Sequence, residues 1–208
     1  MRSPWITQHH FTGSVVTLEA LDPIRHRDGL VTAGAEASIW TFLRFAPGDT
    51  PAGMDAHIAE LIRRRDAGSE VPYIVRRTAD NLIVGVTRFI ELRPEHRGLE
   101  LATWLHPSAQ GQGVNPEVKL LMLSHAFDDL GCIRVQIKTD ATNAPARRSL
   151  EALGAVYEGT LRNHRVKELA DGTGQVRDTA YFSILPSEWP AISPRLLARA
   201  RAALGTGS

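Results

Sequence analysis

The chain has 208 residues, 43% of them hydrophobic, with 24 lysine and arginine residues against 23 aspartate and glutamate residues. This length favours one domain with one substantial core, and the net charge of +1 excludes a broad basic surface for nucleic acid or an anionic membrane. No segment has the apolar length of a transmembrane helix, and the first residues lack the pattern of a cleaved signal, so we expect a cytoplasmic protein without a membrane partner.

The first third of the chain predicts a strand and two helices. Val15 to Glu19 is a short β-branched run, and Asp22-Pro23 after it has the cap-then-proline order that opens a helix. A second helix is indicated by apolar residues on one face, followed by basic residues that suit a helix C-terminus: Met54, Ile58, Leu61, Ile62, then Arg63, Arg64 and Arg65.

Three strands follow. The ranges 71–77 and 82–92 are rich in β-forming residues, and the turn residues 78–81 between them predict a hairpin. Leu99 to Leu105 forms a third strand, which His106-Pro107 ends.

The remainder alternates helix and strand. A helix is expected over 116–130, a strand over 133–139, and a helix capped by Asn143 and ended by Gly154. Two strands, 155–166 and 176–185, are joined across the turn dipeptide Asp171-Gly172. A final helix over 194–204 precedes residues 205–208, which we expect to be disordered.

The segment 110–116 has the features of an anion site. Gly111 and Gly113 lie in a loop that leads into a helix, with Asn115 expected at the cap and Pro116 at the first helical position. Several backbone N–H groups would then meet at the positive end of a helix, which suits a pyrophosphate. On its own the loop is equally typical of an ordinary capped strand-to-helix connection.

Two other phosphate motifs do not fit this loop. Pro116 occupies the position of the third glycine in a dinucleotide fingerprint, and Gly111 comes five residues after the strand instead of directly after it. No Gly-Lys-Ser/Thr follows, which excludes a P-loop.

The run Gln110-Gly111-Gln112-Gly113-Val114-Asn115 resembles the pyrophosphate loop of the GNAT superfamily of N-acetyltransferases, Gln/Arg-x-x-Gly-x-Gly/Ala, although Asn115 departs from it at the last position. The block from Asn143 through Ser149 to Leu153-Gly154-Ala155 resembles the family's Asn-led helix. The C-terminal segments, among them Glu158-Gly159-Thr160-Leu161-Arg162 and Tyr181-Phe182-Ser183-Ile184-Leu185, look like the hairpin of its RimJ/RimL-like branch.

This resemblance implies an α/β (α+β) GNAT fold. The family has a central mixed, mostly antiparallel, twisted sheet of about seven strands, splayed between its fourth and fifth strands and flanked by about four helices. Residues 1–190 would form a single N-acetyltransferase domain, and 191–208 a C-terminal helix and tail. The implied function is transfer of the acetyl group of acetyl-CoA to a primary amine, either a protein or peptide N-terminal α-amine or a small-molecule amine, by direct attack in a ternary complex.

The resemblance also implies catalytic residues. Glu100 opens Glu100-Leu101-Ala102-Thr103-Trp104-Leu105, which resembles the branch's Glu-Ile-Gly-Tyr-Trp-Leu strand, where the glutamate is the usual general-base candidate. A solvated carboxylate at the start of a strand is an equally good interpretation of this residue. The family's acid is absent, because the usual tyrosine and serine positions hold Leu150 and Ala146. Ser149, one helical turn from Ala146, is the substitute we consider, although a surface or back-bonded helical serine is the more common case.

The implied coenzyme contacts lie on three segments. The backbone of Trp104, Leu105 and His106 would bind the pantetheine arm in a β-like manner, and Asn143 would reach the same arm. Residues 110–115 would hold the pyrophosphate. Arg147 and Arg148 would meet the 3′-phosphate, unless they form an exposed basic helix face.

Several alternatives remain. A non-catalytic acyl-CoA sensor or interaction module would also keep the loop, and a homodimer is compatible with the pattern. Eight histidines occur, but no His-Glu-x-x-His or Cys-x-x-Cys spacing predicts a metal site. The lone Cys132 is expected to be a buried structural thiol.

Overall fold

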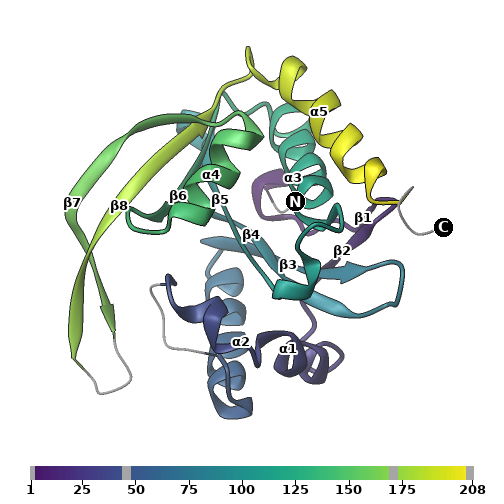
Figure 1. The fold of residues 1–208 in the computed structure, drawn as a ribbon, viewed down its shortest axis with the longest axis vertical. Coiled ribbons are helices and arrows are strands. Elements are labelled where there is room, and N and C mark those ends of the chain that lie inside the picture. The colour runs from purple at the N-terminus through teal and green to yellow at the C-terminus, as the bar shows by residue number, and fades with distance from the viewer. Residues whose placement is uncertain (1–2, 44–47, 169–172, 205–208) are drawn as a thin grey trace.

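The computed structural model describes residues 3–43, 48–168 and 173–204. Their secondary structure is a single eight-stranded sheet with helices on both faces (Figure 1). The strands run in the order β1-β2-β3-β4-β5-β6-β8-β7, and every neighbouring pair is antiparallel except β5 and β6. Their bounds are β1 Phe11–Thr12, β2 Val16–Ala20, β3 Glu70–Arg77, β4 Ile83–Arg93, β5 Gly98–Leu105, β6 Arg134–Asp140, β7 Val156–Glu168 and β8 Gly174–Ile184.

Five α-helices occur in the described residues: α1 Arg27–Gly34, α2 Pro51–Asp66, α3 Val114–Ser124, α4 Ala144–Leu153 and α5 Trp189–Ala202. A π-helical turn, His125–Asp129, continues α3, so the predicted helix over 116–130 is present with an irregular last turn. The mixed, mostly antiparallel sheet is confirmed, with the short strand β1 added. Each predicted strand agrees with the observed one to within two residues.

Two predicted helix boundaries are wrong. Asp22-Pro23 does not open a helix, because the Asp22 carboxylate accepts the N–H groups of Ile24 and Arg25 and holds a turn, and α1 begins only at Arg27. The C-terminal helix starts at Trp189 instead of Pro194, which lies inside α5. The turn at Asp171-Gly172 and the tail 205–208 lie outside the described residues.

The two faces of the sheet bury separate apolar clusters. Leu99 and Leu101 of β5 pack with Val118 and Met122 of α3, on the face that α4 and α5 also cover. Trp104 of the same strand packs with Leu61 of α2 and other residues of α1 and α2. Figure 1 shows α1 and α2 on the opposite side of the sheet from α3 and α5. Successive residues of β5 therefore face different layers of the molecule.

The start of α3 is fixed to the N-terminal strands by a buried carboxylate. Glu117 is 3% exposed, and its two oxygens accept the backbone N–H groups of Ser14, Val15 and Val16 at 2.6–2.9 Å, together with the Ser14 hydroxyl at 3.0 Å. These are charge-assisted bonds from groups that would otherwise be unpaired. The anchor sets the position of the loop that precedes α3.

Cys132 is buried, as predicted, and burial raises the pKa of its thiol to about 12. The thiol is therefore protonated and unreactive at neutral pH.

None of the helices in the described residues has both the length and the apolar character that a membrane span requires.

Candidate active site

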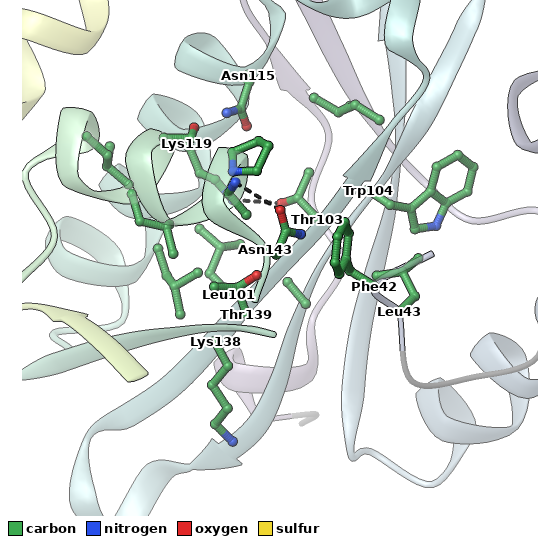
Figure 2. A pocket seen from close by; sticks show the side chains of 18 of the residues that line it. Phe42, Leu43, Leu101, Thr103, Trp104, Asn115, Lys119, Lys138, Thr139 and Asn143 are labelled. Atoms are coloured by element: carbon green, nitrogen blue, oxygen red, sulfur yellow. Dashed lines mark hydrogen bonds between the residues drawn. The ribbon is translucent and has the colours of Figure 1, made fainter. Parts of the chain in front are cut away.

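The parallel pair β5–β6 holds together only at its beginning. Gly98, Leu99 and Glu100 pair with Arg134, Val135 and Gln136, and no later residues of the two strands are paired. The splay predicted between the fourth and fifth strands is thus present. These strands are β5 and β6 because the short strand β1 was not predicted, and the splay starts directly after Glu100. A cavity of about 820 Å³ occupies the opening and reaches both faces of the sheet, with Trp104 on one side and Lys119 and Asn143 on the other (Figure 2).

The glycine loop lies at one end of this cavity. Gly111 and Gly113 both have a φ of +72°, a left-handed backbone conformation that residues with a Cβ rarely adopt. A Cβ on Gly111 would meet nothing within 4 Å, whereas a Cβ on Gly113 would lie 2.7 Å from the carbonyl oxygen of Ala200 in α5. Gly113 is therefore required both by its backbone angle and by the close approach of the C-terminal helix.

The predicted helix start is shifted by two residues. Gly113 is the N-cap of α3, Val114 is its first residue, and Asn115 and Pro116 lie in the first turn, so Asn115 is not the cap. Within the described chain, the backbone N–H groups from Gly111 to Asn115 donate no hydrogen bond. The N–H of Glu117 is the next in the chain after Pro116, and it donates to the carbonyl oxygen of Gly113. Pro116 has no N–H. The unpaired donors that suit an anion are thus present, and the loop itself supplies most of them.

Most of the predicted site residues line the cavity: Glu100, Trp104, Leu105, Gln110, Gly111, Gly113, Asn115, Asn143 and Ser149. Asn143 caps α4 as predicted, because its side-chain oxygen accepts the N–H of Ala146 at 3.1 Å. Ser149 is exposed, and beside it the cavity is lined by Leu150 and Ala146, the two positions where the family's usual acids are missing.

Five predicted side chains lie elsewhere. Val114 is fully buried in the core, the Gln112 side chain accepts from Arg77 at 2.6 Å, and the His106 ring bonds the neighbouring Ser108. The Arg147 guanidinium donates to the backbone of Ala141 and lies 5.2 Å from the centre of the Tyr157 ring, and Arg148 is exposed. Neither arginine reaches the cavity wall. This differs from the expected phosphate contact, because the helix turns this face toward β7 and solvent.

Glu100 is held in a buried polar cluster. It is 6% exposed, its carboxylate lies 2.6 Å from the Lys138 ammonium, and it accepts from Gln136 at 3.2 Å. Lys138 also bonds Glu91 at 2.6 Å. Burial, the largest influence, raises the pKa of Glu100, and the neighbouring Lys138 only partly offsets it.

Glu91 owes its position to an irregular backbone. Its φ is +47°, and the β4–β5 register shifts between Ile90 and Arg93 at this point. A non-glycine residue in this conformation costs roughly 1–2 kcal/mol and persists only where surrounding contacts hold it. The bulge places the Glu91 carboxylate in the cavity wall, beside Lys138.

Several residues of the cavity wall were not predicted from the sequence. Lys119 of α3 lies in the wall and bonds Thr103 of β5 at 2.8 Å (Figure 2). Arg199 of α5 and residues of the β7–β8 hairpin, among them Arg165, also line it. Lys119 follows Asn115 at i+4 and so shares its helix face, a spacing that could have indicated it. The other positions depend on how distant segments pack.

Comparisons with known proteins agree with this architecture. Residues 16–156 match a family model described as "Acetyltransferase (GNAT) domain". A solved structure of a "putative acetyltransferase" from T. thermophilus is 36% identical, with a TM-score of 0.82 over 93% of this chain and 97% of that one.

Two further proteins are more distant. The Bacillus subtilis (strain 168) protein called "Putative ribosomal N-acetyltransferase YdaF" is 26% identical over 113 residues, which cover 53% of this chain and 57% of that relative. Mycobacterium smegmatis RimJ, solved with CoA-disulfide, shares the fold, with a TM-score of 0.72 at 18% identity over 89% of this chain and 88% of that one.

In the described residues, no group of three or more potential ligands is placed to hold a metal ion.

Proposed function

Because the chain belongs to the GNAT acetyltransferase family, we propose that it transfers the acetyl group of acetyl-CoA to a primary amine, by direct attack of the amine in a ternary complex. The acceptor is a protein or peptide N-terminal α-amine or a small-molecule amine. One observation carries this proposal: a single cavity runs from the glycine loop through the β5–β6 opening to Glu100.

The loop end of the cavity fits the coenzyme. Its unpaired N–H groups and the positive end of α3 suit a pyrophosphate, and the space beside Gly111, where a Cβ would lie, is open for a phosphate. Beyond Glu100, the edge of β5 that faces β6 lacks a partner strand, so its backbone groups from Leu101 to Leu105 are available for β-like bonds to the pantetheine amides. Acetyl-CoA supplies the thioester whose acetyl group is transferred.

The opposite face of β5 suits the amine. Trp104 lies on the α1–α2 side, where Phe42 and Leu43 also line the cavity (Figure 2). By the alternation of side chains along β5, Glu100 faces the same side. The indole Nε1 of Trp104 is buried without a hydrogen-bond partner within the described residues. It can donate to a carbonyl oxygen of the acceptor, as a peptide N-terminus would provide. Coenzyme and amine would thus reach the opening from opposite faces, which supports direct attack.

Glu100 would act as the general base, directly or through a water molecule. A protonated α-amine with a pKa of 7.7–8.0 needs about 1 kcal/mol for deprotonation at pH 7, whereas a lysine side chain needs about 4.6 kcal/mol. A carboxylate whose pKa is raised by burial is a better proton acceptor than an exposed one, while Lys138 and Gln136 hold it in place. This base is sufficient for an α-amine.

The relatives support the same class of acceptor. The curated relative bears the name of a ribosomal N-acetyltransferase, and the RimJ fold neighbour agrees with the RimJ/RimL-like branch. We therefore rank peptide N-termini first among acceptors and small amines second.

The test is acetyl-CoA consumption across a panel of N-terminal peptides, free amino acids, polyamines and aminoglycosides. We expect thiol release that depends on one class of amine, with peptides giving the highest kcat/KM. Glu100→Gln should lower kcat by roughly 100-fold while the affinity for CoA stays the same. Thiol release at the same rate with and without every amine would contradict the proposal.

A further inference from the structure

Lys119 is a buried amine whose surroundings do not balance its charge. The side chain is 7% exposed, and its Nζ donates to the Thr103 hydroxyl at 2.8 Å. That hydroxyl also lies 2.8 Å from the Thr87 hydroxyl. Among the described residues, no carboxylate oxygen lies within 4 Å of Nζ. Burial lowers the pKa of Lys119 to about 7, so the amine can both hold and release a proton near neutral pH.

The other charged groups near the cavity do not neutralise it. Glu100 and Glu91 are both bonded to Lys138, and Glu100 faces the opposite side of β5. The carboxylate of Glu117, on α3 itself, accepts hydrogen bonds from the backbone N–H groups of Ser14, Val15 and Val16. From α5, the charged group in the wall is Arg199, a cation. α4 contributes uncharged side chains there, Ser149 among them, and so does its N-cap, Asn143.

Lys119 stands where a thioester must pass. Strands β5 and β6 separate after Glu100, so a thioester that reaches Glu100 from the glycine loop has to enter the sheet through this opening. Thr103 is three residues beyond the last paired residue and, by the alternation of β5, faces the same side as Leu101, toward α3. The bond between Lys119 and Thr103 therefore places the amine beside the opening, on the coenzyme side.

The positions that usually supply the acid are occupied by apolar side chains. Leu150 and Ala146 of α4 line the same cavity and have no proton to donate, and Ser149 is exposed. The leaving thiol has a pKa near 8.5, so an acid with a pKa near neutrality is matched to it.

Building on the proposed acetyl transfer, we propose that Lys119 is the general acid that protonates the leaving sulfur of coenzyme A. As the acceptor nitrogen bonds to the acetyl carbon, the carbon–sulfur bond breaks and its electron pair goes to sulfur. The Lys119 ammonium gives this sulfur its proton and becomes a neutral amine. Glu100 takes one proton from the acceptor ammonium before the attack and later releases it to solvent. The nitrogen loses its second proton to solvent as the amide forms, and Lys119 is reprotonated from solvent.

The kinetic test compares kcat across pH for the wild type, Lys119→Met and Lys119→Arg, each with saturating amine. The wild-type kcat should fall at alkaline pH as the ammonium loses its proton. Both variants should lose this alkaline limb and 10- to 100-fold in kcat. Arginine keeps the charge but does not release its proton near neutral pH, so it separates proton donation from simple charge.

A second measurement does not depend on activity. The sequence contains three lysines, Lys119, Lys138 and Lys167. The rate at which 1-fluoro-2,4-dinitrobenzene modifies each one, mapped by peptide mass spectrometry, reports how the neutral amine fraction changes with pH. We expect Lys119 to titrate near pH 7 and to be protected by CoA. Lys138, whose ion pairs raise its pKa, serves as the internal control.

The outcomes separate this inference from the proposed function. Wild-type protein that binds CoA but transfers acetyl to no amine contradicts both. Normal transfer by Lys119→Arg, or a loss in Lys119→Met confined to CoA affinity with kcat unchanged, overturns the acid role alone. Titration of Lys119 above pH 9 in the labelling experiment overturns it as well, even if the variants do not fold.

Discussion

Glu117→Gln tests whether the carboxylate at the start of α3 anchors the coenzyme loop. Each of its oxygens accepts two hydrogen bonds, one from Ser14 N–H and hydroxyl and the other from the N–H groups of Val15 and Val16. Glutamine has one acceptor oxygen and one NH₂ group, so at least one of the three backbone N–H groups loses its partner and the remaining bonds lose their charge assistance. One unsatisfied donor costs about 1–3 kcal/mol, and bonds to a charged group contribute about 1.5–3 kcal/mol each. We expect a total loss of about 4 kcal/mol.

The assay is urea denaturation followed by tryptophan fluorescence, with thermal unfolding alongside. For a chain of this length, about 4 kcal/mol corresponds to a decrease in Tm of about 10 °C. Glu151→Gln, at an exposed position of α4, is the matched control and should stay within about 0.5 kcal/mol of the wild type. A Glu117→Gln variant within about 1 kcal/mol of the wild type would refute the anchoring role.

Three further predictions concern the loop and the cavity. Gly111→Ala should lower the free energy of unfolding by about 1 kcal/mol, from backbone strain alone. Gly113→Ala, whose Cβ also meets Ala200, should lower it by about 3 kcal/mol and weaken CoA binding more. Equal losses of stability in the two variants would contradict the contact with α5. The Lys119 pKa of about 7 lies below its ordinary value of 10.5, so the native protein binds fewer protons than the unfolded chain between these pH values, and wild-type stability should rise as pH increases from 7 to 10. Lys119→Met should remove this slope and be more stable than the wild type at pH 7, by at most about 4 kcal/mol. Urea titrations of both proteins at pH 7 and pH 10 test this. The same difference in unfolding free energy between the two proteins at both pH values would exclude the pKa shift. Because burial raises the pKa of Glu100, the kcat of the wild type at saturating amine should have an acidic limb above pH 4.5 that Glu100→Gln lacks, and identical limbs in the two proteins would show that Glu100 is not the base.

The strands were predictable because they follow from local signals, whereas the opening between β5 and β6 was expected only from the resemblance to the GNAT family. β-branched runs between turn residues gave the strand bounds to within two residues, and the glycines at 111 and 113 marked the left-handed loop. The helix boundaries were less predictable, because a side chain can hold a turn instead of a cap. Asp22 accepts two backbone N–H groups without starting a helix, and Gly113 replaces Asn115 as the cap of α3.

The cavity wall was predictable only in part. Glu100, Asn143 and the loop lie in motifs, whereas Lys119 meets Thr103 across sixteen residues and Lys138 joins Glu91 to Glu100 across two strands. Arg147 shows the opposite case, since the sequence places it one helical turn after Asn143 but cannot show that its guanidinium turns toward Tyr157. Such pairings are set by packing between elements, and no local pattern encodes them.

The central claim is that the glycine loop at the start of α3 holds the coenzyme and directs its thioester into the opening beside Glu100. Calorimetric titration of CoA into the wild type and into Gly113→Ala tests it most directly. We expect saturable heat with one CoA bound per chain, and at least tenfold weaker binding to the variant. Absence of binding heat at several temperatures, or equal affinity in the two proteins, would contradict it.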